Sequence, residues 1–164
     1  MYSHTPEGYQ CPLCEIAAGL DNSDGWTTQA EVVLRNEHIV AWINPQWWPE
    51  NHGAVVISPI AHFENIFDFP PAHAVHIQAA ARLVALAMKE CYGCDGISTR
   101  QHNEPAGNQD VWHYHVHVFP RYVGDRLYQR HLEKERIPLE DRVRCAERLR
   151  PVIEKLEETG MLND

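Results

Sequence analysis

The sequence predicts an α+β fold, in which one antiparallel sheet is covered by a long central helix and a C-terminal helix. Short stretches of strand character lie mostly between residues 31 and 122, and the two longest helical stretches are 70–91 and 139–158. Strands grouped between helices in this way are typical of a layered α+β domain. A chain of 164 residues can bury a sizeable core, and we expect residues 1–164 to form a single domain.

The strands are predicted from runs of apolar and β-branched residues bounded by turn-forming residues. They are expected at 31–36, 38–44, 53–59, 94–102 and 112–122. A turn at Asn36 and Glu37 separates the first two strands. The stretch 53–59 is nearly all apolar, so we expect it to be buried on both faces before Pro59 ends it.

The helices are predicted from composition and from the residues at their ends. Residues 11–20 are expected to form a short helix that Gly19 closes. The Ala- and Leu-rich stretch 70–91 begins with prolines and is followed by Gly93, as helix starts and ends favour. The helix 139–158 is amphipathic, with apolar residues at roughly helical spacing: Val143, Leu149, Val152, Ile153 and Leu156.

Composition and charge argue against several classes of function. The formal net charge of −9 does not suit a protein that binds nucleic acid through its phosphates, which requires clustered basic residues. No apolar run approaches the roughly 18 residues of a membrane-spanning helix, so we expect no membrane partner. The first ten residues lack the basic and apolar regions of a secretory signal, and five cysteines would leave one unpaired in a disulfide framework. We therefore expect a cytoplasmic protein.

Three histidines occupy alternate positions in the last predicted strand: His113, His115 and His117. Side chains alternate across a strand, so these three are expected on one face. The other face carries the large apolar residues that would pack against the long helix: Trp112, Tyr114, Val116 and Val118. The spacing alone leaves open a solvated outer face, a catalytic zinc site with histidine ligands, and a nucleophilic histidine that attacks phosphorus.

The histidines belong to a longer motif, His113-Tyr-His115-Val-His117-Val-Phe119, which resembles the signature of the histidine triad (HIT) family. The segment GNQDVW directly before it and the stretch GAVVISPIAHFENIFDFP from Gly53 are also similar to that family. With the Cys-x-x-Cys near the N-terminus and the central helix, the resemblance covers about residues 11–122. A C-terminal extension of about 123–164 lies beyond it.

The resemblance implies a nucleotide hydrolase or nucleotidyltransferase with a small-molecule nucleotide substrate. Members of the family act on the α-phosphate of nucleoside phosphoramidates, dinucleoside polyphosphates or nucleotide sugars. The resemblance implies that His115 is the nucleophile, that His117 contacts the phosphate and that Asn103 faces the scissile bridge. It places Asn44 at the ribose hydroxyls and Gln109 among the substrate-binding residues.

The sequence departs from the family pattern at two positions. Asp110 stands where many members have a Ser or Thr that donates to phosphate, and a carboxylate there would repel the substrate. Ala54 replaces a family histidine, and His52 in the preceding loop either substitutes for it or is a surface histidine. Trp47 and Trp48 in the same loop either stack on a base, close a dimer contact, or only pack.

The Cys-x-x-Cys of Cys11 and Cys14 is typical of a tetrahedral zinc site, which needs two more ligands. One alternative adds Cys91 and Cys94 to give a four-thiolate site, and another is that no zinc is bound.

A resemblance to galactose-1-phosphate uridylyltransferases, relatives of the HIT family, implies a third alternative. In those proteins a histidine after a Ser-Pro motif and the first triad histidine complete the site. The ligand set implied here is Cys11, Cys14, His62 and His113. Such a site has no open position for water, so its zinc would be structural.

Three classes of function remain open. The first is a nucleotide hydrolase or transferase that uses His115, and the second is a nucleotide-binding or adaptor module with negligible turnover, which Asp110 favours. The third is a zinc hydrolase with the metal on His115 and His117. The family resemblance further implies a homodimer, the commonest oligomer. Three arginines around the start of the extension would then reach toward a polyphosphate: Arg121, just before it, and Arg126 and Arg130 within it.

Overall fold

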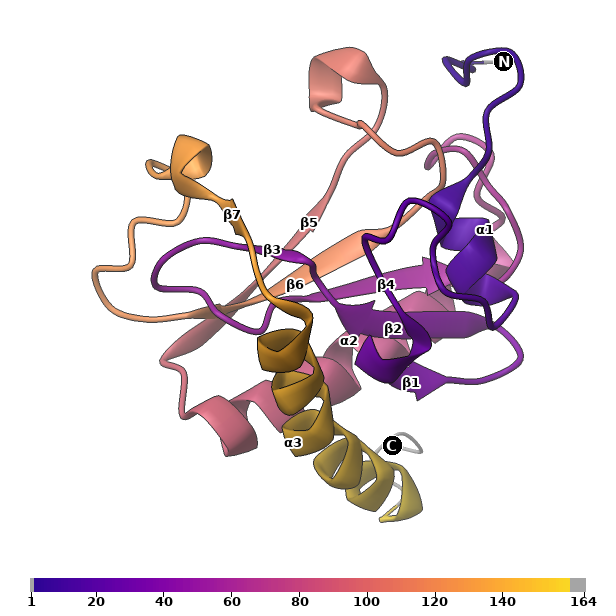
Figure 1. Ribbon diagram of the computed structural model, residues 1–164. Coiled ribbons are helices and arrows are strands. Elements are labelled where there is room, and N and C mark those ends of the chain that lie inside the picture. The colour runs from indigo at the N-terminus through magenta and orange to yellow at the C-terminus, as the bar shows by residue number, and fades with distance from the viewer. Residues whose placement is uncertain (1, 160–164) are drawn as a thin grey trace.

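The computed structural model describes residues 2–159 and has a five-stranded sheet at its centre (Figure 1). The strand order is β1-β2-β4-β6-β5, and every neighbouring pair is antiparallel. The strands are β1 Val32–Arg35, β2 Ile39–Ile43, β4 Val55–Pro59, β5 Gly96–Gln101 and β6 Val116–Arg121. The predicted α+β class is therefore confirmed. Met1 and residues 160–164, which belong to the predicted domain, lie outside the described residues.

Two long helices cover one face of the sheet, and a short helix covers part of the other. The main core joins α2 (Pro71–Tyr92) and α3 (Leu139–Glu158) to one set of strand residues, which includes Ile39, Ala41 and Ile43. The alternate residues of β2 pack instead against α1 (Pro12–Ala17). Because side chains alternate across a strand, α1 lies on the opposite face from α2 and α3. Among the described residues, no helix is long and apolar enough to cross a membrane.

The helix ends follow the predicted chemistry. At the end of α2, Gly93 adopts a left-handed φ of 63°, and its N–H donates to the carbonyl of Lys89 at 3.2 Å. This conformation suits a glycine that closes a helix. In α3, the predicted residues Leu149, Ile153 and Leu156 are buried.

One buried position of α3 differs from the prediction. Val143 is only half-buried, and Arg142 beside it is buried. The Arg142 guanidinium is ion-paired with the buried carboxylate of Glu31 and also donates to the carbonyl of Trp26 at 2.8 Å. A buried charge is tolerated only when it is paired and hydrogen-bonded, and a pattern of apolar spacing does not reveal such a pair.

The strand predicted at 112–122 is shorter than expected and begins at Val116. Val116 pairs with Gln101, the last residue of β5, so that the edge strand ends at this point. Two residues earlier, the N–H of Tyr114 donates to the carbonyl of Phe63 at 2.6 Å. His113 and His115 therefore lie in an irregular segment before β6, and only His117 lies in a strand.

The apolar residues around the histidines do not all face the long helices. Tyr114, Val116 and Val118 belong to the core beneath α2, as predicted. Trp112 does not: it is half-buried, and its ring lies 6.0 Å from the ring of His4. The prediction for Trp112 was wrong because the regular alternation stops where the strand ends.

The C-terminal extension returns to the loop that follows β2. Within it, β7 (Glu135–Arg136) pairs with β3 (Gln46–Trp47) in a separate two-stranded sheet, and neither strand was predicted. Trp47 and Trp48 are buried, which supports a packing role, and His52 is an exposed histidine stacked on Trp47. The short 3-10 helices are Gln29–Glu31, Pro105–Gly107 and His131–Glu133.

Candidate catalytic and metal site

His117 lies on the face of the sheet that α1 partly covers. In the sheet register it stands opposite Val56 of β4, which packs with α1. Residues opposite each other in a pair of strands share a face, so His117 points to that side. Its ring is stacked on Phe119 at 5.7 Å and lies 5.0 Å from the ring of His115. The Nδ1 atom of His117 lies 3.5 Å from Nδ2 of Asn44, so the structure brings three predicted site residues together.

The His115 ring is held by the backbone carbonyl of His113. Its Nδ1 lies 2.7 Å from the carbonyl oxygen of His113. A carbonyl can only accept, so Nδ1 carries the proton and Nε2 presents a lone pair. No hydrogen bond reaches Nε2 from any residue in the described range 2–159. The side chain is 7% exposed, and burial lowers the pKa of its imidazole, which favours the neutral form.

The pKa of His117 is also depressed. Burial is the main cause, and the neighbouring ring of His115 and the positive charges of Arg100 and Lys134 act in the same direction. Both imidazoles are therefore uncharged near neutral pH. A neutral imidazole with a free lone pair can act as a nucleophile.

The side chains of Gln109 and Asn103 form hydrogen bonds within the protein. The Gln109 amide donates to the carbonyl of Glu64 at 2.6 Å and accepts from the N–H of Glu104 at 2.8 Å. The Asn103 oxygen accepts from the N–H of Ile66 at 2.8 Å, and its amide bonds to Gln101. These contacts hold the segment before the histidines against the loop after β4. The predicted contacts of Gln109 and Asn103 with substrate stay predictions.

Two residues near His117 were not singled out from the sequence. The His102 ring lies 6.5 Å from the ring of His117, and Arg100 stands directly opposite His117 in the register of β5 and β6. The pairing of the two strands was the missing information, because Arg100 and His117 are 17 positions apart in the sequence.

The arginines expected to reach a polyphosphate are mostly engaged elsewhere. Arg121 binds both oxygens of Asp125, with contacts of 2.7 Å each. Arg130 is held by Glu133 at 2.7 Å and lies 3.5 Å from Glu50. Arg126 is exposed. The cations whose charge acts on His117 are instead Arg100 and Lys134.

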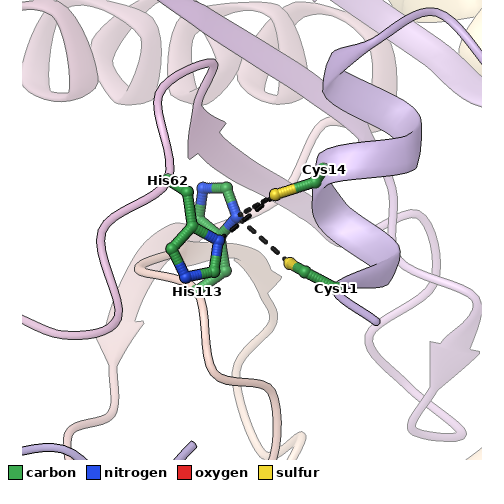
Figure 2. A group of neighbouring side chains, drawn as sticks. All are labelled: Cys11, Cys14, His62 and His113. Atoms are coloured by element: carbon green, nitrogen blue, oxygen red, sulfur yellow. Dashed lines mark hydrogen bonds between the residues drawn. The ribbon is translucent and has the colours of Figure 1, made fainter. Parts of the chain in front are cut away.

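A second cluster joins α1 to the segment after β4 and to the segment before β6 (Figure 2). Its members are the four predicted metal ligands: Cys11, Cys14, His62 and His113. Their sulfur and nitrogen atoms all lie within 4.8 Å of one another. Figure 2 shows the two thiols of the α1 end facing the two imidazoles.

The geometry of this cluster fits a tetrahedral metal ion. The His113 Nδ1 lies 3.3 Å from the Cys11 sulfur and 3.5 Å from the Cys14 sulfur, and the His62 Nδ1 lies 3.2 Å from the Cys14 sulfur. Zinc bonds of about 2.3 Å to sulfur and about 2.0 Å to nitrogen separate tetrahedral ligand atoms by about 3.5 Å. The donor set and its spacing therefore suit zinc, and His115 and His117 are not part of it.

The surroundings of His113 also suit a metal ligand. Its side chain is completely buried, and Nε2 lies 3.2 Å from the carbonyl oxygen of Pro59. That carbonyl places the proton on Nε2 and leaves the Nδ1 lone pair toward the sulfurs, as metal-bound histidines require. Burial lowers the pKa of His113 to about 4, and burial raises the pKa of the Cys14 thiol to about 12.

The second Cys-x-x-Cys lies elsewhere in the structure. The Cys91 thiol donates to the carbonyl of Arg148 at 3.2 Å, and Cys94 is buried in the main core. Among the described residues, the cysteine and histidine cluster is the group found with metal-ligand geometry. The four-thiolate alternative is therefore not supported.

Comparison with known proteins agrees with the motif. A model of the HIT domain matches residues 27–124. The structure is similar to that of a zinc-bound histidine triad family protein from Mycobacterium smegmatis, with a TM-score of 0.74 and 26% sequence identity. That similarity covers 92% of this chain and 97% of the other.

Two further proteins match over most of the sequence. Protein hit from Bacillus subtilis is 29% identical over 112 residues, which are 68% of this chain and 71% of that protein. A bis(5'-adenosyl)-triphosphatase from Dictyostelium discoideum is 25% identical over 134 residues, which are 77% of this chain and 88% of that protein.

Proposed function

The chain belongs to the HIT domain family, and on that premise we propose that it is a nucleotide hydrolase or nucleotidyltransferase with His115 as its nucleophile. The substrate would be a nucleoside phosphoramidate or a dinucleoside polyphosphate. The observation that carries the proposal is the 2.7 Å hydrogen bond from His115 Nδ1 to the His113 carbonyl, which leaves Nε2 with its lone pair. The similarity to a protein named as a bis(5'-adenosyl)-triphosphatase supports the substrate class.

The proposed reaction has two displacements at the α-phosphorus. The Nε2 lone pair of His115 forms a bond to phosphorus, and the bond from phosphorus to the leaving group breaks, with its electron pair going to the leaving group. Water then bonds to phosphorus, the bond to Nε2 breaks, and His115 recovers its lone pair. A polyphosphate leaves as its anion, whereas the nitrogen of a phosphoramidate takes a proton from solvent before it leaves as ammonia. In the second step one water proton goes to solvent and the other stays on the nucleotide product. His117, beside His115, would contact the phosphoryl oxygens, and Asn44 the ribose.

We further propose that Cys11, Cys14, His62 and His113 hold a structural zinc ion. Zinc would supply a positive charge that stabilises the thiolates and a cross-link between α1 and the segment before β6. The four side chains would fill its coordination sphere and leave no position for water. His113 would thereby be fixed in place, and with it the carbonyl that orients His115.

The experiment that tests the proposal traps the intermediate. The protein is mixed rapidly with adenosine 5′-phosphoramidate or diadenosine triphosphate and analysed by mass spectrometry after digestion. We expect an adenylyl group on the peptide that contains His115, and turnover in the steady state. An adduct on another residue, or turnover with no adduct on any time scale, would reject His115 as the nucleophile.

A second candidate function is nucleotide binding without turnover. The observation that favours it is Asp110, whose carboxylate raises the pKa of His115 against the effect of burial and bears the same sign of charge as a phosphate. Tight binding of AMP by a protein that forms no adduct would select this candidate. An Asp110→Ser variant that gains turnover would then identify the carboxylate as the cause.

The homodimer is also proposed, on two features of the surface. The strand β5 is at the edge of the sheet, so one side of its backbone pairs with no strand of the main sheet. Beside it, Val75 at the start of α2 is 63% exposed. Exposed edges and apolar residues favour contact with a second copy. Light scattering at micromolar concentration checks this: a mass near 18.9 kDa, that of one chain, would reject the dimer.

A further inference from the structure

Arg100 occupies an unusual environment beside His117. Its guanidinium carbon lies 4.5 Å from the centre of the Phe119 ring, 5.2 Å from the Trp48 ring and 5.8 Å from the Tyr128 ring. Phe119 is in turn stacked on His117. Three aromatic rings therefore hold the guanidinium on the face of the sheet that carries His117, the residue paired with Arg100 across β5 and β6.

Within residues 2–159, no hydrogen bond reaches the Arg100 guanidinium. Its Nε atom is buried and has no hydrogen-bond partner among residues 2–159, and the nearby Trp48 Nε1 is a second buried donor in the same condition. No ion pair with a carboxylate is formed by Arg100 within the described chain, and burial lowers its pKa. Buried donors without acceptors cost free energy, so they indicate that an acceptor from outside the chain completes the cluster.

The position of Arg100 in the sheet places it where the leaving group of a substrate would lie. The sheet order places β6 between β4 and β5, with β2 beyond β4. Asn44, the predicted ribose contact, follows β2, and Arg100 is in β5. His117 lies between them. A substrate with its ribose at Asn44 and its α-phosphate at the histidines would extend its leaving group toward Arg100.

Lys134 adds a second positive charge near His117, on the side of Asn44. It lies in the extension directly before β7, and β7 is held against β3 after Asn44. Its charge, like that of Arg100, disfavours protonation of His117. An anionic group is therefore attracted to this region although the whole chain carries a formal net charge of −9.

We propose that Arg100 is a specificity-determining residue that binds a phosphate of the leaving group, so that substrates with a nucleotide or polyphosphate leaving group are preferred over substrates with a neutral one. This inference rests on the proposed function of the site. When the bond from the α-phosphorus to its bridging oxygen breaks, the electron pair stays on the leaving oxygen. The guanidinium of Arg100 stabilises the negative charge that develops there.

The test compares ligands and substrates that differ only on the leaving-group side. AMP ends at the α-phosphate, whereas ADP carries one more phosphate, and calorimetric titration gives both affinities. In the wild type we expect ADP to bind more tightly than AMP. Arg100→Gln should weaken ADP binding by about ten- to a hundred-fold, the range expected for a charge-assisted hydrogen bond, and change AMP binding by about two-fold or less.

Kinetics provide a second readout. For Arg100→Gln, kcat/KM should fall about ten- to a hundred-fold with diadenosine triphosphate and change little with adenosine 5′-phosphoramidate, whose leaving group is ammonia. Arg100→Lys keeps the charge and should recover part of the loss. The matched control is Arg144→Gln, which removes the same charge from an exposed position on α3, across the sheet from the site.

The possible outcomes are distinct. An equal loss for AMP and ADP, or for both substrates, would mean that Arg100 only supports Phe119 and His117, and would overturn the proposal, as would no loss at all. Should Arg100→Gln fail to fold, Arg100→Lys carries the test: we expect a partial loss of ADP affinity with AMP affinity unchanged, and an unaffected ADP affinity rejects the proposal. A wild type that binds both nucleotides without turnover contradicts the proposed chemistry and leaves the ADP comparison decisive. A wild type that binds neither overturns both.

Discussion

His113 and His115 are separated by one residue, yet the structure uses their ring nitrogens in opposite ways. In His113 the Nε2 atom faces the carbonyl of Pro59 at 3.2 Å, and Nδ1 faces the cysteine sulfurs. In His115 the Nδ1 atom faces the carbonyl of His113 at 2.7 Å, and Nε2 is left open. The same side chain is a candidate metal ligand in one place and a candidate nucleophile in the other, because a backbone carbonyl selects which nitrogen keeps its lone pair.

The largest expected effect comes from removing the open nitrogen. His115→Ala should lower turnover by about 10⁴-fold or more, since a covalent nucleophile cannot be replaced by binding alone. Metal content should stay at the wild-type level and the fold should stay mostly intact, because His115 is outside the cysteine and histidine cluster. Steady-state kinetics, metal analysis and a thermal melt on one preparation check this. If the variant retains more than a few per cent of the activity, His115 is not the nucleophile.

The next effect concerns the proposed zinc site that contains His113. Cys14→Ser should lose the bound zinc, and because a structural metal contributes folding free energy, the melting temperature should fall by about 10 °C. Cys91→Ser is the matched control, since Cys91 lies outside the cluster and should keep about one zinc per chain. Elemental analysis of both variants is decisive. Full zinc content in Cys14→Ser would mean that the ion is held elsewhere.

The smallest effect concerns stability in acid, where the titration of Asp125 has to be separated from that of the histidines. The Arg121 guanidinium, with further hydrogen bonds from Asn51 and two backbone N–H groups, holds the pKa of Asp125 below its usual range. A depressed carboxyl pKa stabilises the fold above the unfolded value of about 3.9 and loses this contribution as pH falls through the folded value. At pH 7, Asp125→Asn should therefore be less stable by about 2 kcal/mol, a difference that shrinks below about pH 4.

Urea unfolding of both proteins from pH 7 to pH 2.5 measures that difference. Any remaining acid sensitivity of Asp125→Asn then belongs to other groups, the histidines among them. A stability difference that stays constant down to pH 2.5 would show that Asp125 contributes by shape rather than by charge.

Much of the fold was predictable, because each confirmed element has its own local pattern. The Ala- and Leu-rich run before Gly93 and the apolar spacing before Glu158 were enough to place α2 and α3. The strand β6 was placed too early, since alternation in the sequence continues to Trp112 while the neighbouring strand β5 has ended at Gln101. Where a strand loses its partners is a tertiary property, and no local pattern reports it.

The site divides in the same way. Its four candidate metal ligands were predicted from the Cys-x-x-Cys motif and a family resemblance, which depend on local features, and the structure brings their ligand atoms within 4.8 Å of one another. Arg100 and Arg142 were not found. Arg100 packs against aromatic rings and Arg142 is paired with Glu31. In both cases the contacting residues are far away in the sequence. A charged residue in a sequence looks the same whether it is solvated, paired or reserved for a ligand.

The pairing of β3 with β7 has a consequence for synthesis of the chain. Chains emerge from the ribosome from the N-terminus, and early segments fold first. The metal cluster draws on residues up to His113, so it can close while the last third of the protein is still being made. The segment with Lys134 cannot take its place until Arg136 has emerged to meet Gln46. A nascent chain that folds as it is made would therefore gather the cysteine and histidine cluster first and place Lys134 last.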